Sequence, residues 1–459
     1  MRPPNQAARN QLTTVLGRRA GVSAADLAGP LGVSIPTLHR LLHEQAGRVL
    51  AAGAARRRRY ALRRPLRGEL AELPLYEVDR DGRAERVAQL ALVHPEGTWM
   101  DLADTGWPLV DEARDGWWGG LPYPLYDMRP QGYMGRQFAR AEHRELAVSA
   151  NPEEWSDDDI VHVLNRSGVD MSGNLILGNP AFEHWQAGKL LPPEPLKPRA
   201  LGRTYASLAE HAIAAGVAAS SAAGDFPKFS ALRDRAGSAT PHVLVKFSGA
   251  DGSPAVRRWA DLLVCEHLAA ECAGTLPGIE SARTRIVGHA GRTFLEVERF
   301  DRHGLFGRSR LASLATLEAA LLGDGSTDWT RLAERFAAIG LVAPGDVERV
   351  HHLWWYGRLI ANTDMHTGNL SFRPQGLLAL APAYDMLPML YAPLPGGELP
   401  TRTFQPPLPL PPQRSTWTTA CAAATAFWTR ASQDARISEG FRQACAVNAQ
   451  RLQQIAERV

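Results

Sequence analysis

The chain has 459 residues, 45% of them hydrophobic and 22% charged, so it is long enough for two or three folded domains of ordinary globular composition. No stretch is apolar for long enough to cross a bilayer, and the first residues lack the apolar segment of a signal peptide. Four scattered cysteines are too few for a disulfide framework, so we expect a cytoplasmic protein with reduced thiols and no membrane partner.

The net charge of +3 conceals a strongly basic N-terminal segment. Residues 1–73 contain 13 Arg, no Lys and four acidic residues, which gives this segment a charge of +9 and leaves −6 for the rest. Such an asymmetry indicates that only the basic segment meets a polyanion. Arginine is strongly preferred to lysine throughout, so each retained lysine is slightly informative. The four lysines are Lys189, Lys197, Lys228 and Lys246.

Residues 23–43 predict two short helices with a turn between them. Ser23 and Asp26 fit a capping box before the first helix, Gly32 marks the turn, and Ser34 caps the second helix. Leucines of both helices face inward, which leaves an outward polar face on the second helix. The members of that face are Thr37, His39, Arg40 and His43. This spacing is typical of a helix-turn-helix, whose second helix enters the major groove of DNA.

Two short β-like runs follow around Gly53, together with four consecutive arginines. A hairpin wing would place these arginines at the phosphate backbone, where they give affinity and salt dependence but little sequence choice. We therefore predict a winged helix-turn-helix domain over residues 1–68, with double-stranded DNA as its partner. The alternative is a helical protein-interaction module with a solvated run of charge. The arginines are Arg56, Arg57, Arg58 and Arg59.

The composition changes after Leu73. An alternating stretch with Asp81-Gly82 at its centre predicts a β-hairpin, and a long segment dense in Trp, Tyr and Phe follows between residues 99 and 138. The aromatic side chains of such a segment usually pack into a small separate core under long loops. The alternative is that they form a platform on which nucleic-acid bases stack. A proline-rich connector near residues 190–198 separates this region from the next.

A small-residue loop around Gly224 precedes an apolar strand that carries Lys246. Small side chains let backbone N–H groups approach phosphate oxygens closely, and a cation in a buried strand needs an anionic partner. A nucleotide phosphate would meet both conditions. The alternatives are an ordinary turn and a lysine on an exposed strand face. Residues 293–302 predict a further strand, whose edge would pair its backbone with the adenine in such a site.

Residues 362–372 read Asn-Thr-Asp-Met-His-Thr-Gly-Asn-Leu-Ser-Phe, with Asp364 five positions before Asn369. Asp385 follows beyond a short apolar hairpin. Phosphoryl transfer needs one carboxylate near the attacking hydroxyl and oxygen ligands for Mg²⁺, which this set supplies. The Asp–Asn spacing equals that of the protein-kinase catalytic loop, although His366 follows the Asp instead of preceding it. A plain connecting loop is the alternative, and a zinc site is disfavoured because no second His or Cys lies at ligand spacing.

The segments "ERFDR", "NTDMHTGN" and "YDM", in series after the strand lysine, carry a family resemblance. The chain resembles the HipA-like serine/threonine kinases of bacterial toxin–antitoxin systems, and more narrowly their YjjJ-type branch, which has its own N-terminal DNA-binding segment. The resemblance covers residues 74–390 well. It implies an α+β, protein-kinase-like two-lobed fold of HipA type behind the winged helix-turn-helix domain. The lobes would be a β-rich one over residues 69–300 and a mainly α-helical one over residues 301–459.

The resemblance also implies a role for each matching residue of the catalytic region, with ATP and Mg²⁺ as cofactors. Asp364 would be the catalytic base, and Asn369 and Asp385 would bind Mg²⁺. Lys246 and His366 would contact the ATP phosphates.

The resemblance assigns the remaining nucleotide contacts to two other segments. Glu298 and Phe300 would hold the adenine through their backbone, and Asp301 would lie near the ribose. The loop around Gly224 would cover the phosphates, and autophosphorylation of a serine in this loop would expel it and silence the kinase by like-charge repulsion. The serines at that position are Ser221 and, beside it, Ser220.

The activity that these residues predict is an ATP- and Mg²⁺-dependent serine/threonine protein kinase of HipA toxin type, which inhibits growth by phosphorylating a cellular protein. One alternative is a DNA-binding transcriptional regulator whose kinase-like body binds nucleotide without phosphoryl transfer, and another is a kinase for a small-molecule hydroxyl. The acidic partner of Lys246 is open between Asp261 and Glu266. A separate antitoxin is in doubt, because this chain fuses a DNA-binding segment to its own N-terminus. The oligomeric state, including a homodimer, stays open.

Overall fold

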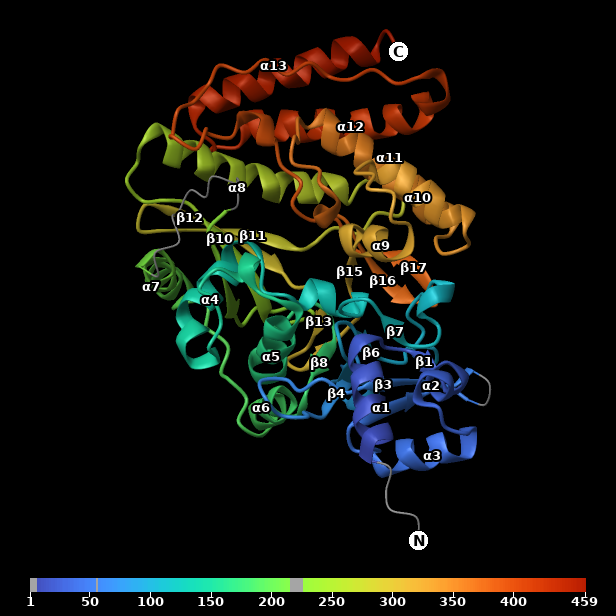
Figure 1. The fold of residues 1–459 in the computed structure, drawn as a ribbon. Coiled ribbons are helices and arrows are strands. Elements are labelled where there is room, and N and C mark those ends of the chain that lie inside the picture. Colours follow the sequence, from blue (N-terminus) through green and yellow to red (C-terminus); the bar gives the residue numbers. More distant parts are fainter. Residues whose placement is uncertain (1–5, 55–56, 215–225) are drawn as a thin grey trace.

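The computed structural model describes residues 6–54, 57–214 and 226–459 and combines helices with sheets in successive units (Figure 1). The N-terminal unit packs three helices on a three-stranded antiparallel sheet of order β1-β3-β2. Its elements are α1 (Gln6–Arg18), β1 (Val22–Ser23), α2 (Ala24–Leu31), α3 (Ile35–Glu44), β2 (Val49–Ala52) and β3 (Arg59–Leu62). A core of its own, which includes Leu12, Leu27 and Leu38, holds the unit together.

The helix signals predicted in this unit are present with one exception. Ser23 Oγ accepts a hydrogen bond from Asp26 N at 3.2 Å and donates to the Asp26 carboxylate at 2.6 Å. Gly32 has a φ of 60°, the left-handed conformation that glycine adopts most easily after a helix. Ser34 does begin α3, but its hydroxyl contacts Thr37 Oγ1 at 3.0 Å and makes no cap bond to the backbone. The predicted cap at Ser34 is therefore wrong in detail, because a neighbouring hydroxyl competes for it.

A middle unit is built on a five-stranded antiparallel sheet of order β7-β6-β5-β4-β8. Its strands are β4 (Leu73–Val78), β5 (Ala84–Leu92), β6 (Thr98–Trp99), β7 (Trp117–Trp118) and β8 (Leu175–Leu177). Its helices are η2 (Asp111–Ala113), η3 (Tyr123–Met128), α4 (Gly132–Leu146), η4 (Pro152–Glu154), α5 (Asp157–Ser167), η5 (Gly168–Asp170) and α6 (Asn179–Leu190). Trp107, Tyr123 and Tyr133 are each at most 5% exposed, so packing explains this part of the aromatic-rich segment.

A four-stranded antiparallel sheet of order β11-β12-β10-β9 comes next, with α7 and α8 packed against it (Figure 1). Its elements are α7 (Leu201–Ala214), β9 (Lys228–Leu232), β10 (His242–Phe247), α8 (Pro254–Ala273), β11 (Thr284–His289) and β12 (Arg292–Glu298). Successive side chains of a strand point to opposite faces. In β10, Val243, Val245 and Phe247 enter the core on one face, so Lys246 points to the opposite face while still lying in a central strand.

The C-terminal part is mainly helical and carries a three-stranded sheet of order β15-β16-β17. Its strands are β13 (Arg302–His303), β14 (Gly307–Arg308), β15 (Ala312–Ser313), β16 (Ser371–Gln375) and β17 (Leu377–Leu380). Its helices are α9 (Leu314–Leu321), α10 (Trp329–Ala338), α11 (Pro344–Leu359), η6 (Thr367–Asn369), η7 (Met389–Tyr391), η8 (Pro411–Gln413), α12 (Arg414–Gln433) and α13 (Glu439–Ala456). In Figure 1, α12 and α13 lie at the end of the molecule opposite α3.

One large hydrophobic core runs from the middle unit into the C-terminal helices, and it includes Leu75, Leu262 and Trp417. The N-terminal unit is joined to the middle unit by short contacts instead. Arg64 N donates to Leu92 O at 2.9 Å, and the Arg64 guanidinium forms an ion pair with Asp158 at the start of α5. The fold is therefore α+β, as predicted, whereas the predicted domain boundaries at residues 68/69 and 300/301 stay predictions.

Within the described ranges, no helix combines the length and the apolar character that a membrane span requires.

Candidate active site

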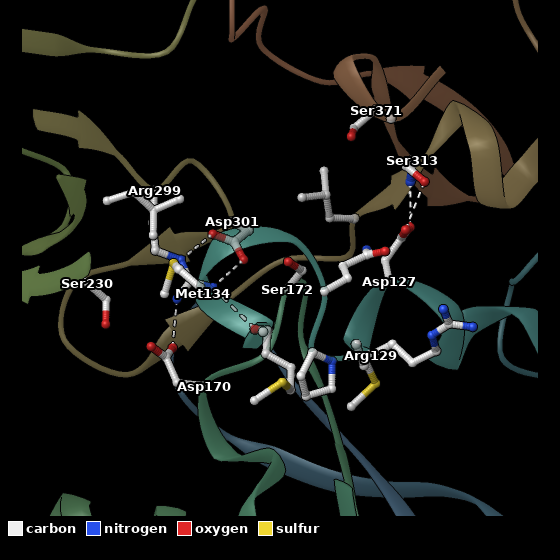
Figure 2. A pocket seen from close by; sticks show the side chains of 18 of the residues that line it. Asp127, Arg129, Met134, Asp170, Ser172, Ser230, Arg299, Asp301, Ser313 and Ser371 are labelled. Atoms are coloured by element: carbon white, nitrogen blue, oxygen red, sulfur yellow. Dashed lines mark hydrogen bonds and ion pairs between the residues drawn. The ribbon is translucent and has the colours of Figure 1, made fainter. Parts of the chain in front are cut away.

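A cleft of about 1100 Å³ lies where the four-stranded sheet, the C-terminal part and the middle unit meet. β9 and β10 form one wall, and the loop before η6 and the loop after β17 form another. α4 and the residues around η5 and η3, all from the middle unit, form the third. Figure 2 labels residues that line the cleft from β9 (Ser230), from the middle unit (Asp127, Asp170) and from β15 and β16 (Ser313, Ser371).

Lys246 lies in the wall formed by β10 and is 6% exposed. Its Nζ donates to both carboxylate oxygens of Glu266 on α8, at 2.7 and 2.9 Å, and it forms an ion pair with Asp385. Glu266 is thus the acidic partner that the sequence left open. Asp261, the other candidate, accepts hydrogen bonds from Ser438 N at 2.7 Å and Ser438 Oγ at 2.6 Å instead.

The charges of Lys246, Glu266 and the half-buried Asp385 perturb one another. Burial lowers the pKa of Lys246, but the carboxylates of Asp385 and Glu266 outweigh it and raise the pKa above its ordinary value. Burial raises the pKa of Asp385, yet the charges of Lys246 and Lys228 hold it at about 2. Burial also raises the pKa of Glu266, against the charge of Lys246. Asp385 is therefore an ionised carboxylate at neutral pH, which suits it to bind a metal ion.

The loop before η6 has a defined shape. Asn362 Oδ1 accepts from Asp364 N at 3.0 Å, and Asn369 Nδ2 donates to Asp364 O at 2.8 Å. Gly368 N donates to His366 Nδ1 at 3.1 Å, and Tyr384 OH donates to Gly368 O at 2.7 Å. His366 lines the cleft with Lys246 and Asp385, and its predicted phosphate contact stays a prediction. Asp364 and Asn369 belong to the same loop but are not among the residues that line the cleft.

Asn369 and Asp385 have donor atoms that suit Mg²⁺, which prefers hard oxygen ligands. The Nδ2 of Asn369 is engaged with the Asp364 carbonyl, which leaves its Oδ1 as the atom free to act as a ligand. Among the described residues, no group of three or more His, Cys, Asp or Glu is arranged to hold a metal ion. Mg²⁺ at nucleotide sites is held through one or two protein ligands together with phosphates and waters, so two oxygen donors fit this metal.

The hinge segment that follows β12 connects the four-stranded sheet to the C-terminal part. Glu298 N donates to Arg283 O at 2.8 Å, and the Glu298 carboxylate accepts from Arg233 Nη2 at 2.9 Å, so its backbone N–H and its side chain are both engaged within the protein. Phe300 lines the cleft, and its ring centroid lies 5.7 Å from that of Tyr384. Within the described ranges, no hydrogen bond engages Phe300 N–H, which makes it the available hinge donor.

A buried group of charges lies beside the hinge. Asp301 lines the cleft, but its carboxylate is bound by Arg299 Nη2 at 2.9 Å, Arg302 Nη1 at 2.7 Å and Gly173 N at 3.0 Å. Arg299 and Arg302 also pair with Asp170 of the middle unit at 2.8 and 3.0 Å. Despite burial, these guanidinium groups hold the pKa of Asp301 well below its usual range.

The predicted DNA contacts lie outside the cleft, on the N-terminal unit. Thr37 is half-buried, and His39 and Arg40 are exposed on α3, which Figure 1 places at the edge of the molecule away from α12 and α13. Arg57 and Arg58 are exposed, and Arg59 is half-buried at the start of β3. Four further predicted residues lie outside the described residues: Arg56, Ser220, Ser221 and Gly224.

Sequence reasoning assigned no role to Lys228, a cation of the cleft. Lys228 on β9 is opposite Lys246 in the sheet register, lines the cleft, and lowers the pKa of Asp385 by its charge. The signal was present, because Lys228 is one of only four lysines in the chain. The wall contributed by the middle unit gave no comparable signal.

Comparison with known proteins identifies the family. Residues 220–459 match the model of the HipA-like C-terminal domain, and residues 69–186 match that of the YjjJ-like toxin middle domain. Toxin YjjJ of Escherichia coli (strain K12) is 35% identical over 440 residues, which is 95% of this chain and 96% of that protein. The chain therefore belongs to the HipA-like toxins, in their YjjJ-like branch, as the sequence motifs predicted.

Solved structures support the fold. HipA from the toxin–antitoxin system of Shewanella oneidensis MR-1, solved as a complex with HipB and its operator DNA, superimposes with a TM-score of 0.53 at 16% identity, covering 84% of this chain and 97% of that one. The Helicobacter pylori proinflammatory kinase CtkA overlaps with a TM-score of only 0.34 at 12% identity, over 50% of this chain and 90% of CtkA, which is too low to carry an inference. The body thus has the mixed α/β, kinase-like fold of HipA.

Proposed function

We propose that this protein is an ATP- and Mg²⁺-dependent serine/threonine protein kinase that inhibits growth by phosphorylating a cellular protein. The observation that carries the proposal is the ion-paired trio of Lys246, Glu266 and Asp385 in the lining of the cleft. A lysine fixed between a helix carboxylate and a metal-binding carboxylate is the arrangement that phosphoryl-transfer sites of kinases require.

Each residue of the site has a proposed task. Lys246, Lys228 and His366 bind the phosphate oxygens of ATP and neutralise their charge. Asn369 and Asp385 hold Mg²⁺, which when bound supplies further positive charge at the phosphates. Asp364 accepts the proton of the attacking serine or threonine hydroxyl while that oxygen bonds to the γ-phosphorus and ADP leaves.

The adenine is held at the hinge, where Phe300 N–H is the free donor. Phosphorylation of Ser220 or Ser221 in the loop around Gly224 silences the enzyme, because a dianion there repels the phosphates of ATP. This part of the proposal is supported by the family resemblance alone.

We also propose that the N-terminal unit is a winged helix-turn-helix that binds double-stranded DNA. The order of its helices and strands, its separate core and its exposed cationic residues on α3 and before β3 support this role. DNA binding at this end leaves the cleft accessible, because the two surfaces lie on different units.

The decisive experiment is the intact mass of the purified protein after incubation with Mg²⁺ and ATP, next to the Asp364→Asn variant. A gain of one phosphoryl group in the wild type that is absent in the variant supports the kinase. If neither protein gains mass and the wild type starts unmodified, the regulator that binds nucleotide without transferring phosphate becomes the better hypothesis. The position of Asp364 outside the cleft lining is the observation that favours that second candidate.

A further inference from the structure

The middle unit builds the wall of the cleft beside the hinge. Residues 169–172, at and after η5, line the cleft together with hinge residues 299–301. In Figure 2, Asp170 and Ser172 lie on the same side of the cleft as Arg299 and Asp301. A nucleoside whose base is held at the hinge and whose phosphates reach Lys246 places its sugar between these two points, next to this wall.

Both oxygens of the Asp301 carboxylate already accept hydrogen bonds within the protein. Its Oδ2 accepts from Gly173 N, Arg299 Nη2 and Arg302 Nη1, which saturates that oxygen. Its Oδ1 accepts only from Arg299 Nε at 3.1 Å and keeps a second acceptor position. The residue is only 5% exposed, so burial keeps a ribose hydroxyl away from that position.

Asp170 has the accessible acceptor oxygen that Asp301 lacks. Both guanidinium contacts, from Arg299 Nη1 and Arg302 Nη2, fall on its Oδ1, and no donor from the described part of the chain binds its Oδ2. Its side chain is 47% exposed and lines the cleft. Partial desolvation raises the pKa of Asp170, but the charges of Arg299 and Arg302 outweigh it and hold the pKa at about 2, so the group stays ionised. Its Oδ2 is therefore a strong, unused acceptor.

On the basis of the nucleotide site proposed above, we propose that Asp170 of the middle unit recognises the ribose of ATP, with its Oδ2 accepting a hydrogen bond from the 2′-hydroxyl. An ionised carboxylate that accepts from a ribose hydroxyl is a recurrent device of nucleotide sites. The two arginines hold Asp170 in place through its other oxygen, so the free oxygen needs no reorganisation. The middle unit is then part of the nucleotide site and selects ribonucleotides over 2′-deoxyribonucleotides.

The experiment is a calorimetric titration of the full-length protein with ATP and with 2′-deoxy-ATP at constant Mg²⁺. A hydrogen bond to a charged acceptor predicts that the wild type binds ATP about tenfold or more tightly than 2′-deoxy-ATP. Asp170→Asn keeps one acceptor oxygen for the arginines but replaces the other by an NH₂ group and removes the negative charge. The ratio of the dissociation constants of 2′-deoxy-ATP and ATP should then be close to one.

Asp301→Asn is the matched control, since it perturbs the same two arginines, whereas in this proposal the sugar contact comes from Asp170 and not from Asp301. It should weaken both nucleotides equally and leave their ratio unchanged. Equal binding of the two nucleotides by the wild type, or an unchanged ratio in Asp170→Asn, would overturn the inference while leaving the kinase proposal intact. The preference of the wild type for ATP over 2′-deoxy-ATP tests the inference even where a variant does not fold. If the wild type binds neither nucleotide, the proposed function fails and this inference fails with it.

Discussion

Glu266 and Asp261 offer a direct test of the site, because they are two buried carboxylates on the same helix with different partners. Both are 3% exposed, and they lie five residues apart on α8. Glu266 holds Lys246 through both of its oxygens, whereas Asp261 holds the backbone and hydroxyl of Ser438 before α13. One substitution therefore changes the proposed active site and the other changes only the packing of α13.

We expect Glu266→Gln to lower phosphoryl transfer strongly while the protein stays folded. Glutamine keeps one acceptor oxygen for Lys246 but turns an NH₂ group toward the ammonium, so at least one charge-assisted hydrogen bond is lost. Such a bond contributes about 1.5–3 kcal/mol, and about 1.4 kcal/mol corresponds to tenfold in rate. If the full amount is expressed in the transition state, kcat/KM for ATP falls by about 10- to 100-fold.

The matched control is Asp261→Asn, which removes one acceptor for Ser438. It should reduce the free energy of unfolding by about 1 kcal/mol and leave kcat/KM of the folded protein unchanged. Initial rates with γ-labelled ATP give the activity, and urea denaturation gives the stability. Wild-type activity in Glu266→Gln, or equal losses of activity in both variants, would show that the Lys246–Glu266 pair does not set the geometry of transfer.

Three further predictions follow from the structure. Lys228→Met should raise KM for ATP about tenfold, since one charged contact to phosphate is lost, and an unchanged KM would remove Lys228 from the site. Replacing Arg57, Arg58 and Arg59 by Ala should weaken binding to all DNA sequences and reduce the slope of log K against log salt by about 0.9 per lost phosphate contact, measured by fluorescence anisotropy; an unchanged slope would exclude the wing. The pKa of Asp170 lies at about 2 against an ordinary 3.8, so the stability it contributes is present above pH 3.8 and is lost as pH falls through about 2. In Asp170→Asn the free energy of unfolding should therefore fall less steeply with decreasing pH over that interval than in the wild type. Urea denaturation at several pH values measures this dependence, and equal pH dependence in the two proteins would contradict the reasoning.

Local signals predicted the elements with good accuracy where a short stretch decides the structure. The cap at Ser23, the turn at Gly32 and the strand around Lys246 depend on neighbours within a few residues, and all three are present. The motif residues Lys246, His366 and Asp385 also line the same cleft. Only the short β16–β17 hairpin separates His366 from Asp385, and Lys246 is held in place by the apolar strand β10.

Contacts between distant segments could not be predicted in the same way. The choice of Glu266 over Asp261 depends on which side of α8 faces β10, and α8 is buried on more than one side, so its hydrophobic pattern does not reveal that side. The engagement of Asp301 depends on Arg302 and on Gly173, which is 128 residues away in sequence. No pattern in a single chain reveals that a loop of the middle unit reaches the hinge, since that proximity is set by the packing of three separate sheets.

The separate core of the N-terminal unit has a consequence for how such a protein is assembled and inherited. The N-terminal unit buries its own leucines and touches the remainder through backbone pairing and surface ion pairs, whereas the middle unit and the C-terminal helices share one apolar interior. Gain or loss of the N-terminal unit by gene fusion or deletion leaves the core shared by the middle unit and the C-terminal helices intact. A cut between the middle unit and the C-terminal helices exposes apolar surface on both fragments, so those two parts are expected to be gained, lost and refolded only together.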